Sequence, residues 1–378
     1  MQNEYQILSE NNTSTVVAHY ERPSMVADNG YQTEADLERS LIKQLERQGY
    51  EYAQIHNEDE LIANLRVKLE ELNNYHFTDQ EWNRFFKAEI AAEGKGIVDK
   101  TRTIQTDFVK TLKCDNGEEK NIYLIKKDDV HANRTQVINQ YEVWNGSHPN
   151  RYDVSILVNG LPLVHIELKK RGVSIKEAFN QINRYGKESF WAGNGLFEYV
   201  QIFVVSNGTQ TKYYSNTTRD SHINEIKKGG KRNRPKTSNS FEFTSYWADA
   251  SNQVLNDLVD FTATFFSRHT LLNVLTRFCV LTEQDLLLVM RPYQIAATEA
   301  LLNQIERAHN MRKQGTIDAC GYVWHTTGSG KTLTSFKAAQ LATKYDFVDK
   351  VVFVVDRKDL DYQTMKEYDR FQKGAANG

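Results

Sequence analysis

The sequence predicts an α/β protein built from two domains, and three observations lead to this class. Apolar residues recur at helical spacing near the beginning of the chain, and short apolar or alternating runs follow from about 104 to 214. After residue 320, a strand, a glycine-rich loop, a helix and a second strand succeed one another. The length of 378 residues agrees with two or three domains. We place the domains at 1–255 and 256–378, with 1–32 as a loosely ordered arm.

Composition excludes several classes of protein. Lys and Arg total 47 and Asp and Glu total 49, so the chain is not globally basic, although a local basic groove for nucleic acid remains compatible with this balance. Cys114, Cys279 and Cys320 lie far apart, which gives no disulfide framework and no paired zinc ligands. The first residues do not form a signal peptide, and charges interrupt the apolar stretch 271–290. We therefore expect a cytoplasmic protein with no membrane partner.

The first part of the chain is expected to be helical. Thr33 is a suitable N-cap for a helix that ends at Gly49. A second amphipathic helix is expected near 58–72, and residues 78–81 match a capping box at the start of a third. The apolar positions that define the first helix are Leu37, Leu41, Ile42 and Leu45.

The middle of the chain is expected to form strands around one helix. The helix covers about 174–185. A basic run at 225–240 is either a solvated surface loop or a contact to the DNA backbone. The expected strands are 108–112, 122–125, 140–143, 153–158, 164–168 and 200–205.

Residues 151–169 are expected to form a hairpin whose register decides the chemistry. A plain two-residue turn at Asn159 and Gly160 would put Asp153 and Glu167 on opposite faces, because strand side chains alternate. The apolar pattern instead groups Asp153 and Glu167 on one face, together with Ser155, His165 and Lys169. The hairpin must therefore have a three- or five-residue connection or a bulge.

In that register the hairpin supplies a candidate magnesium site. Asp153 and Glu167 converge beside a main-chain carbonyl, and such hard oxygen ligands suit Mg²⁺. The metal would activate water and stabilise charge on a scissile phosphate. Lys169 faces the same site and would position the water or stabilise the phosphorane. The alternative is an exposed hairpin with an ordinary Glu–Lys pair, and His165 is a neighbour of the site rather than a ligand.

Gln181 and Tyr185 lie one turn apart on the expected helix after this hairpin. Both side chains would then reach DNA phosphates or order the active site. The alternative is a polar helix face with a partly buried tyrosine.

These residues resemble a known family. Asp153 followed by Glu167-Leu168-Lys169 is similar to the PD-(D/E)xK nuclease signature, and with Gln181 and Tyr185 it resembles the RecB-like nuclease domain of type I restriction enzyme motor subunits. The resemblance implies a nuclease domain with a mixed sheet and catalytic roles for all five residues.

Two further features bear on this resemblance. The run 159–164 is typical of the family, whereas Tyr152 stands where the family signature has proline, a departure that removes no ligand. The helix that carries Glu34 and Glu38 resembles the family's opening helix, and either carboxylate could supply an additional acidic group.

A second motif, 324–332, has the composition of a phosphate-binding loop between a strand and a helix. Backbone N–H groups and the helix N-terminus would hold phosphate oxygens. Lys331 would reach the β- and γ-phosphates of ATP, and Thr332 would hold Mg²⁺. The loop resembles that of superfamily 2 helicases and therefore implies a RecA-like lobe. Its cofactor-binding residues would be Thr327, Gly328, Ser329, Gly330, Lys331 and Thr332.

Two segments flank this loop. Residues 291–294 resemble a Q-motif with Gln294 contacting adenine, or they simply begin a helix with Pro292 in its first turn. Residues 355–363 resemble helicase motif Ia, or they are an ordinary strand and loop.

The sequence thus resembles the N-terminal part of a type I restriction subunit. No DExH motif or second RecA-like lobe follows the loop, so we expect a truncated motor that binds ATP without turning it over. The resemblance implies Mg²⁺-dependent cleavage of double-stranded DNA, coupled in the intact subunit to ATP-driven translocation, with modification and specificity subunits as partners. The alternatives are a truncated inactive chain that only docks to partner subunits, and a superfamily 2 helicase with a degenerate nuclease domain.

Overall fold

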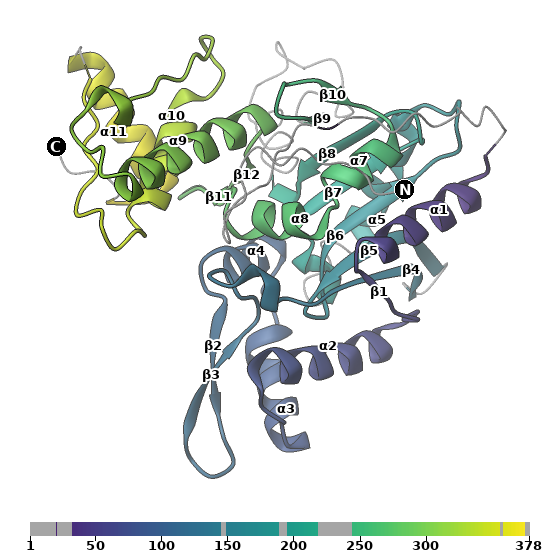
Figure 1. Cartoon of the computed structure of the whole chain (residues 1–378). Coiled ribbons are helices and arrows are strands. Elements are labelled where there is room, and N and C mark those ends of the chain that lie inside the picture. Colours follow the sequence, from purple (N-terminus) through teal and green to yellow (C-terminus); the bar gives the residue numbers. More distant parts are fainter. Residues whose placement is uncertain are drawn as a thin grey trace, which may run out of the picture.

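A computed structural model places a six-stranded mixed sheet at the centre of the protein (Figure 1). Strands β1 and β4 and strands β6 and β7 pair in parallel, and the other neighbours are antiparallel. In sheet order the strands are β1 (Glu51–Tyr52), β4 (Thr135–Trp144), β5 (Pro149–Val158), β6 (Leu161–Leu168), β7 (Ile202–Ser206) and β8 (Thr211–Ser215). The structure describes residues 20, 32–144, 149–188, 195–217, 244–355 and 358–374.

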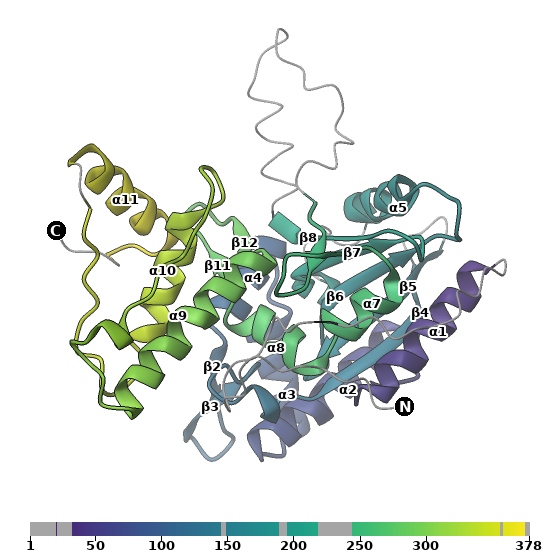
Figure 2. The ribbon, with the colours of Figure 1, turned by 45° about the horizontal axis from the view of Figure 1, so that its top comes forward.

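Helices cover this sheet on both sides. Figure 2 shows α5 (Ile175–Glu188) on one side, where it contacts β6 and β7, and α7 (Leu258–Thr264) with α8 (Arg268–Thr276) on the other. Helix α1 (Glu34–Arg47) packs against α7. Every residue of β6 is buried, because this strand has a neighbour on each edge and helices over both faces.

The expected helical beginning is confirmed. Thr33 caps α1 through a capping box with Asp36, and Thr78 caps α3 through one with Glu81. A hairpin of β2 and β3 projects beside these helices (Figure 1). The elements of this part are α2 (Glu58–Asn73), α3 (Asp79–Phe85), the π-helix Phe86–Ile90, α4 (Ile97–Gln105), β2 (Val109–Lys113), β3 (Glu119–Tyr123) and the short helices Val130–Ala132 and Leu196–Tyr199.

The packing of the first part continues across residue 255, where the sequence placed the domain boundary. Gln44 of α1 and its C-cap Gln48 donate to the carbonyls of Val259 and Thr262, and the Tyr50 hydroxyl donates to the carbonyl of Phe266. The remaining elements are β9 (Trp247–Ala248), β10 (Val254–Leu255), β11 (Cys279–Leu281), β12 (Leu287–Val289), α9 (Pro292–Asn310), the short helix Ile317–Ala319, α10 (Lys331–Ala342) and α11 (Lys358–Phe371).

The hairpin of β5 and β6 combines a two-residue turn with a bulge. Val158 pairs with Leu161 across Asn159 and Gly160, which both have positive φ. The register then shifts, so that Ile156 pairs with Val164 and Leu163 is the extra residue. Pro162, which has no N–H for the ladder, lies inside this irregularity. Of the connections that the sequence allowed, the bulge is the one that forms.

Gly160 is expected to be intolerant of a side chain. Its φ is +83°, and an added Cβ would lie 2.7 Å from Cα of Leu65, which is backbone that cannot rotate away. Gly160→Ala should lower the free energy of unfolding by about 1–3 kcal/mol, measured by thermal unfolding. Gly117→Ala is the matched control, because Gly117 has φ +87° and open space around it. Equal losses in the two variants would show that the contact with Leu65 has no effect.

Two strands that the sequence predicts in the second domain are wrong. Residues 321–324 and 351–355 form no strand pairing, and Tyr322 and Trp324 are 90% and 87% exposed. A parallel strand satisfies its backbone only beside another strand, and the described chain places none next to these segments. The βαβ unit is therefore present as its loop and α10, without its two strands.

Several expectations fall outside the described residues. These are the basic run at 225–240, nearly all of the arm at 1–32, and residues 356 and 357 in the segment that resembles motif Ia. Among the helices that the structure describes, none combines the length and apolarity required to cross a bilayer.

Candidate active site at the open end of the central hairpin

Asp153 and Glu167 lie where strands β5 and β6 separate. The last ladder pair is Val154 with Ile166, and the same register places Asp153 across from Glu167 on one face. The Asp153 carboxylate accepts the backbone N–H of Leu168 at 2.8 Å, a donor that a continuing ladder would use for a carbonyl. The side chain of Asp153 therefore stands in for main chain at the point where the two strands part.

Lys169 joins the two carboxylates, as the sequence predicted. Its Nζ lies 3.7 Å from Oε1 of Glu167 and donates to the Leu168 carbonyl at 2.9 Å. On the other edge of β6, the Lys169 N–H donates to the Ser206 carbonyl at 2.8 Å, so the main chain of this residue stays fixed to the sheet. Two carboxylates, a carbonyl and an ammonium group thus meet in one place.

Of Glu34 and Glu38, the two α1 residues that the sequence offers as an additional acidic group, only Glu34 reaches this place. Its Oε2 lies 3.7 Å from Nζ of Lys169, and its Oε1 accepts the backbone N–H of Lys170 at 3.4 Å. Glu38 instead binds the side-chain amides of Asn139 and Gln140. Glu34 therefore neighbours Lys169, whereas Glu38 fastens α1 to β4.

The electrostatics at Asp153 favour a cation. Burial, followed by the like charge of Glu167, raises the pKa of Asp153 from its ordinary 3.8 to about 8. The Leu168 N–H, Lys169 and His165 lower that pKa by smaller amounts. A divalent cation between the two carboxylates would relieve this repulsion.

The donors at this place are of the kind that Mg²⁺ takes. Mg²⁺ is commonly bound by one or two carboxylates while it keeps several waters, and the donors here are two carboxylates beside the Leu168 carbonyl. Within the described ranges, no three His, Cys, Asp or Glu side chains gather as a set that could hold a metal ion.

His165 and Ser155 lie directly behind Glu167. His165 Nε2 is 3.3 Å from Oε2 of Glu167, and its Nδ1 is 3.1 Å from Oγ of Ser155. Burial lowers the pKa of His165 to about 4, so the ring is neutral at ordinary pH. The sequence put these residues on the same face as Glu167, but alternation alone did not predict that their polar atoms connect.

The predicted helix after the hairpin is α5, and it begins and ends within a few residues of the expected bounds. Gln181 is half-buried on this helix. Tyr185 belongs to α5, but its side chain lies outside the described residues. The roles assigned to this pair stay predictions.

The loop that is predicted to bind phosphate has the backbone that the motif requires. Gly328 and Gly330 have φ of 78° and 80°, and α10 begins immediately after them at Lys331. The Lys331 ammonium donates to the carbonyls of His325 and Thr326 at 3.2 and 3.0 Å. The side chain of Lys331 therefore folds back over its own loop. Thr332 is the next residue and lies in the first turn of α10.

Gln294 contacts this loop. Its Nε2 donates to the Ser329 carbonyl at 2.9 Å, as does the Tyr293 hydroxyl at the same distance. A Cβ on Gly330 would lie only 2.4 Å from that Nε2, so the contact depends on glycine. The start of α9 thus supports the loop, and the adenine contact of Gln294 stays a prediction.

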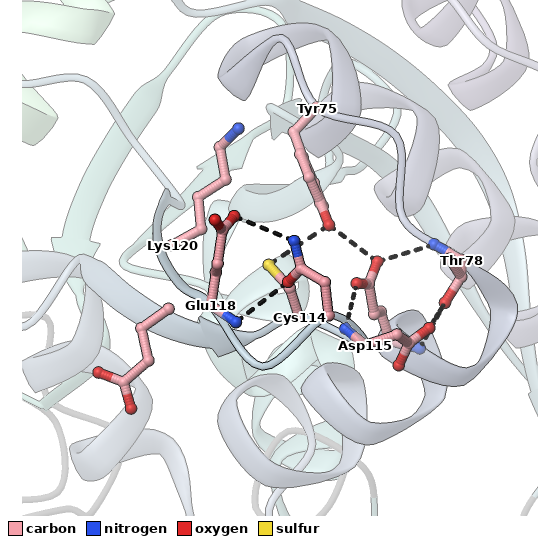
Figure 3. Close-up of a pocket in the computed structure, with 9 residues that line it drawn as sticks. Tyr75, Thr78, Cys114, Asp115, Glu118 and Lys120 are labelled. Atoms are coloured by element: carbon pink, nitrogen blue, oxygen red, sulfur yellow. Dashed lines mark hydrogen bonds between the residues drawn. The ribbon is translucent and has the colours of Figure 1, made fainter.

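A separate surface hollow of about 370 Å³ lies under the β2–β3 hairpin (Figure 3). Glu81 lines this hollow, and its carboxylate accepts from the Tyr75 hydroxyl at 2.9 Å and from the backbone N–H of Asp115 at 2.9 Å. The Thr78 N–H donates to the same carboxylate at 3.0 Å. These bonds attach the hairpin to the start of α3, and the hollow contains none of the predicted site residues.

Comparison with known proteins places this arrangement in a family. Residues 31–222, just over half of the chain, match the family described as "Type I restriction enzyme R protein N terminus". The chain belongs to this family of type I restriction subunits. The matched range contains Asp153, Glu167 and Lys169 as well as Gln181 and Tyr185. Residues 287–378 match a second family, "Type III restriction enzyme, res subunit", and this range contains the predicted phosphate-binding loop.

Individual members of the restriction-subunit family are similar over most of the chain. The "Type I restriction enzyme EcoprrI endonuclease subunit" of Escherichia coli is 48% identical over 300 residues, which are 79% of this chain and 90% of that protein. The "Type I restriction enzyme SsaAORF53P endonuclease subunit" of Staphylococcus saprophyticus is 42% identical over 355 residues, or 92% of this chain. The match spans about a third (34%) of the length of that staphylococcal relative.

Proposed function

We propose that this chain contains the DNA-cleaving centre of a type I restriction endonuclease subunit. The observation that carries the proposal is the convergence of Asp153, Glu167 and Lys169 at the open end of the β5–β6 hairpin. Matched relatives are named endonuclease subunits, which supports a nuclease within the part of the chain that they share. The PD-(D/E)xK arrangement is the fold and motif that we assign to it.

The proposed chemistry is hydrolysis of a phosphodiester in double-stranded DNA. Asp153 and Glu167 would hold Mg²⁺, which when bound supplies an activated water and neutralises charge on the phosphate. Lys169 keeps an ammonium group beside Glu167, where it would position the attacking water or stabilise the developing negative charge. Gln181 and Tyr185 on α5 would contact the DNA backbone.

We further propose that the loop at 327–332 binds the phosphates of ATP with Mg²⁺, and that Gln294 contacts adenine. Support comes from the glycine geometry of the loop and from the family match over residues 287–378. In the intact subunit this nucleotide site would drive DNA translocation. Modification and specificity subunits would be its partners, because the subunit family is that of type I restriction enzymes.

Cleavage of supercoiled plasmid by the intact subunit, assembled with its modification and specificity subunits, tests the nuclease proposal. Glu167→Gln should reduce cleavage by about two to three orders of magnitude, because the metal site loses one of its two charges. Chelation of Mg²⁺ should stop cleavage by the wild type. Glu119→Gln, on an exposed residue of β3, is the matched control. A complex that neither cuts DNA nor hydrolyses ATP would favour a docking role. A complex that hydrolyses ATP without cutting DNA would favour a degenerate nuclease.

A further inference from the structure

Three buried polar side chains form a line behind the proposed metal site. Ser155 and His165 are a cross-strand pair of β5 and β6, and Glu167 follows two residues later on β6. The distances along this line are 3.1 Å from Ser155 Oγ to His165 Nδ1 and 3.3 Å from His165 Nε2 to Glu167 Oε2. Their exposed fractions are 1%, 0% and 0%, so water cannot substitute for these contacts.

The histidine ring is held in place by its neighbours. Tyr152 and Phe203 pack edge to face against it, with ring centroids 5.2 and 6.2 Å away. Rotation of the imidazole would require both aromatic rings to move within a close-packed sheet. Each nitrogen of His165 therefore keeps the partner that it has in the structure.

These contacts specify one arrangement of hydrogens. A carboxylate only accepts hydrogen bonds, so the hydrogen of the neutral imidazole must lie on Nε2, where it donates to Oε2 of Glu167. Nδ1 is then an acceptor, and the Ser155 hydroxyl is its donor. Oε2 of Glu167 is thereby held by His165, whereas Oε1 lies on the side of Lys169.

We propose that His165 is a positioning residue that fixes the Glu167 carboxylate for a divalent cation, with Ser155 selecting the required tautomer. This inference rests on the proposed nuclease function and deepens it. Metal-binding groups depend on such supporting hydrogen bonds for orientation, and their loss typically costs 10- to 100-fold in metal affinity or activity. Here the support acts on a carboxylate ligand and comes from His165 of the same strand, β6, which is supported in turn by Ser155 of the adjacent strand β5.

Binding of Mn²⁺ to the chain, measured by calorimetry without DNA or nucleotide, tests this proposal independently of cleavage. His165→Phe keeps an aromatic ring but removes both nitrogens, and it should weaken Mn²⁺ binding about 10- to 100-fold. His165→Gln can still present an N–H near the Nε2 position and should retain most of the affinity. Ser155→Ala should give an intermediate loss. Ser215→Ala, which removes the buried hydrogen bond from the Ser215 hydroxyl to the Leu287 carbonyl, should bind Mn²⁺ as the wild type does.

The outcomes separate the inference from the proposed function. If wild type binds no Mn²⁺, or if Asp153→Asn binds it equally well, the proposed metal site itself fails. If wild type binds but His165→Phe and Ser155→Ala bind with unchanged affinity, the site stands and the positioning role of His165 is overturned. Should His165→Phe fail to fold in circular dichroism, Ser155→Ala decides the question, because unchanged affinity there contradicts the proposed tautomer selection.

Discussion

Replacing Lys331 with alanine is expected to reduce ATP hydrolysis by the assembled restriction complex by about two to three orders of magnitude. Lys331 is the first residue of α10 and directly follows Gly330 of the glycine turn. In the structure its ammonium group donates to the carbonyls of His325 and Thr326. Because these acceptors are neutral, the ammonium group can leave them when phosphate oxygens arrive. Alanine leaves the loop backbone intact but removes the charge that would bind the β- and γ-phosphates.

Steady-state phosphate release by the complex measures this effect. Lys344→Ala is the matched control, because Lys344 lies just beyond α10 and its exposed ammonium group is 4.0 Å from the exposed carboxylate of Asp128. We expect Lys344→Ala to hydrolyse ATP as the wild type does. Unchanged hydrolysis by Lys331→Ala would show that the loop at 327–332 is not the nucleotide site.

Asp153→Asn is expected to abolish cleavage and at the same time to stabilise the metal-free chain. The folded-state pKa of Asp153 is raised to about 8 from an ordinary 3.8, so the folded protein binds this proton more tightly than the unfolded chain does. The stability that this group contributes is fully present below pH 3.8 and is lost as pH rises through 8. Asparagine never ionises, and its side-chain oxygen can still accept from the Leu168 N–H.

Thermal unfolding from pH 6 to pH 9 without divalent cations measures this prediction. The variant should exceed wild type by roughly 5–10 °C at pH 9, and the difference should shrink towards pH 6. Added Mg²⁺ should raise the midpoint of wild type more than that of Asp153→Asn. A variant that melts below wild type at pH 9 would contradict both the burial and the repulsion assigned to Asp153.

The hairpin shows how far the sequence can define the candidate site. Alternation of apolar residues predicted that Asp153 and Glu167 share a face and that the connection must be irregular, and the bulge at Leu163 confirms this. The prediction succeeded because one face of each strand must enter the core, which fixes the register. Capping residues were equally informative, since Thr33 and Thr78 bond to nearby backbone that is close in sequence.

Contacts between distant segments could not be predicted in this way. The bond from the Leu168 N–H to Asp153 depends on how the strands separate, and periodicity does not contain that information. The sequence likewise predicted neither strand β8 nor the packing of α7 on α1. Tertiary packing chooses the partner of each surface, whereas local sequence specifies only that a surface exists.

The predicted strands at 321–324 and 351–355 failed for a related reason. Their apolar composition is typical of buried parallel strands, but a strand forms only beside a partner that accepts its hydrogen bonds. In the described chain no strand lies alongside either of them, and their apolar side chains stay exposed. Composition thus indicated the kind of element, while the available neighbours decided whether it forms.

The most direct test of the account compares Lys169→Ala with wild type for plasmid cleavage and ATP hydrolysis in the same reaction, using the intact subunit assembled with its partners. Lys170→Ala, an exposed neighbour, is the control. We predict that Lys169→Ala loses cleavage by about 100-fold or more and keeps ATP hydrolysis, because the proposed nuclease and nucleotide sites use separate residues. If Lys169→Ala still cuts DNA at the wild-type rate, the β5–β6 hairpin is not the nuclease centre.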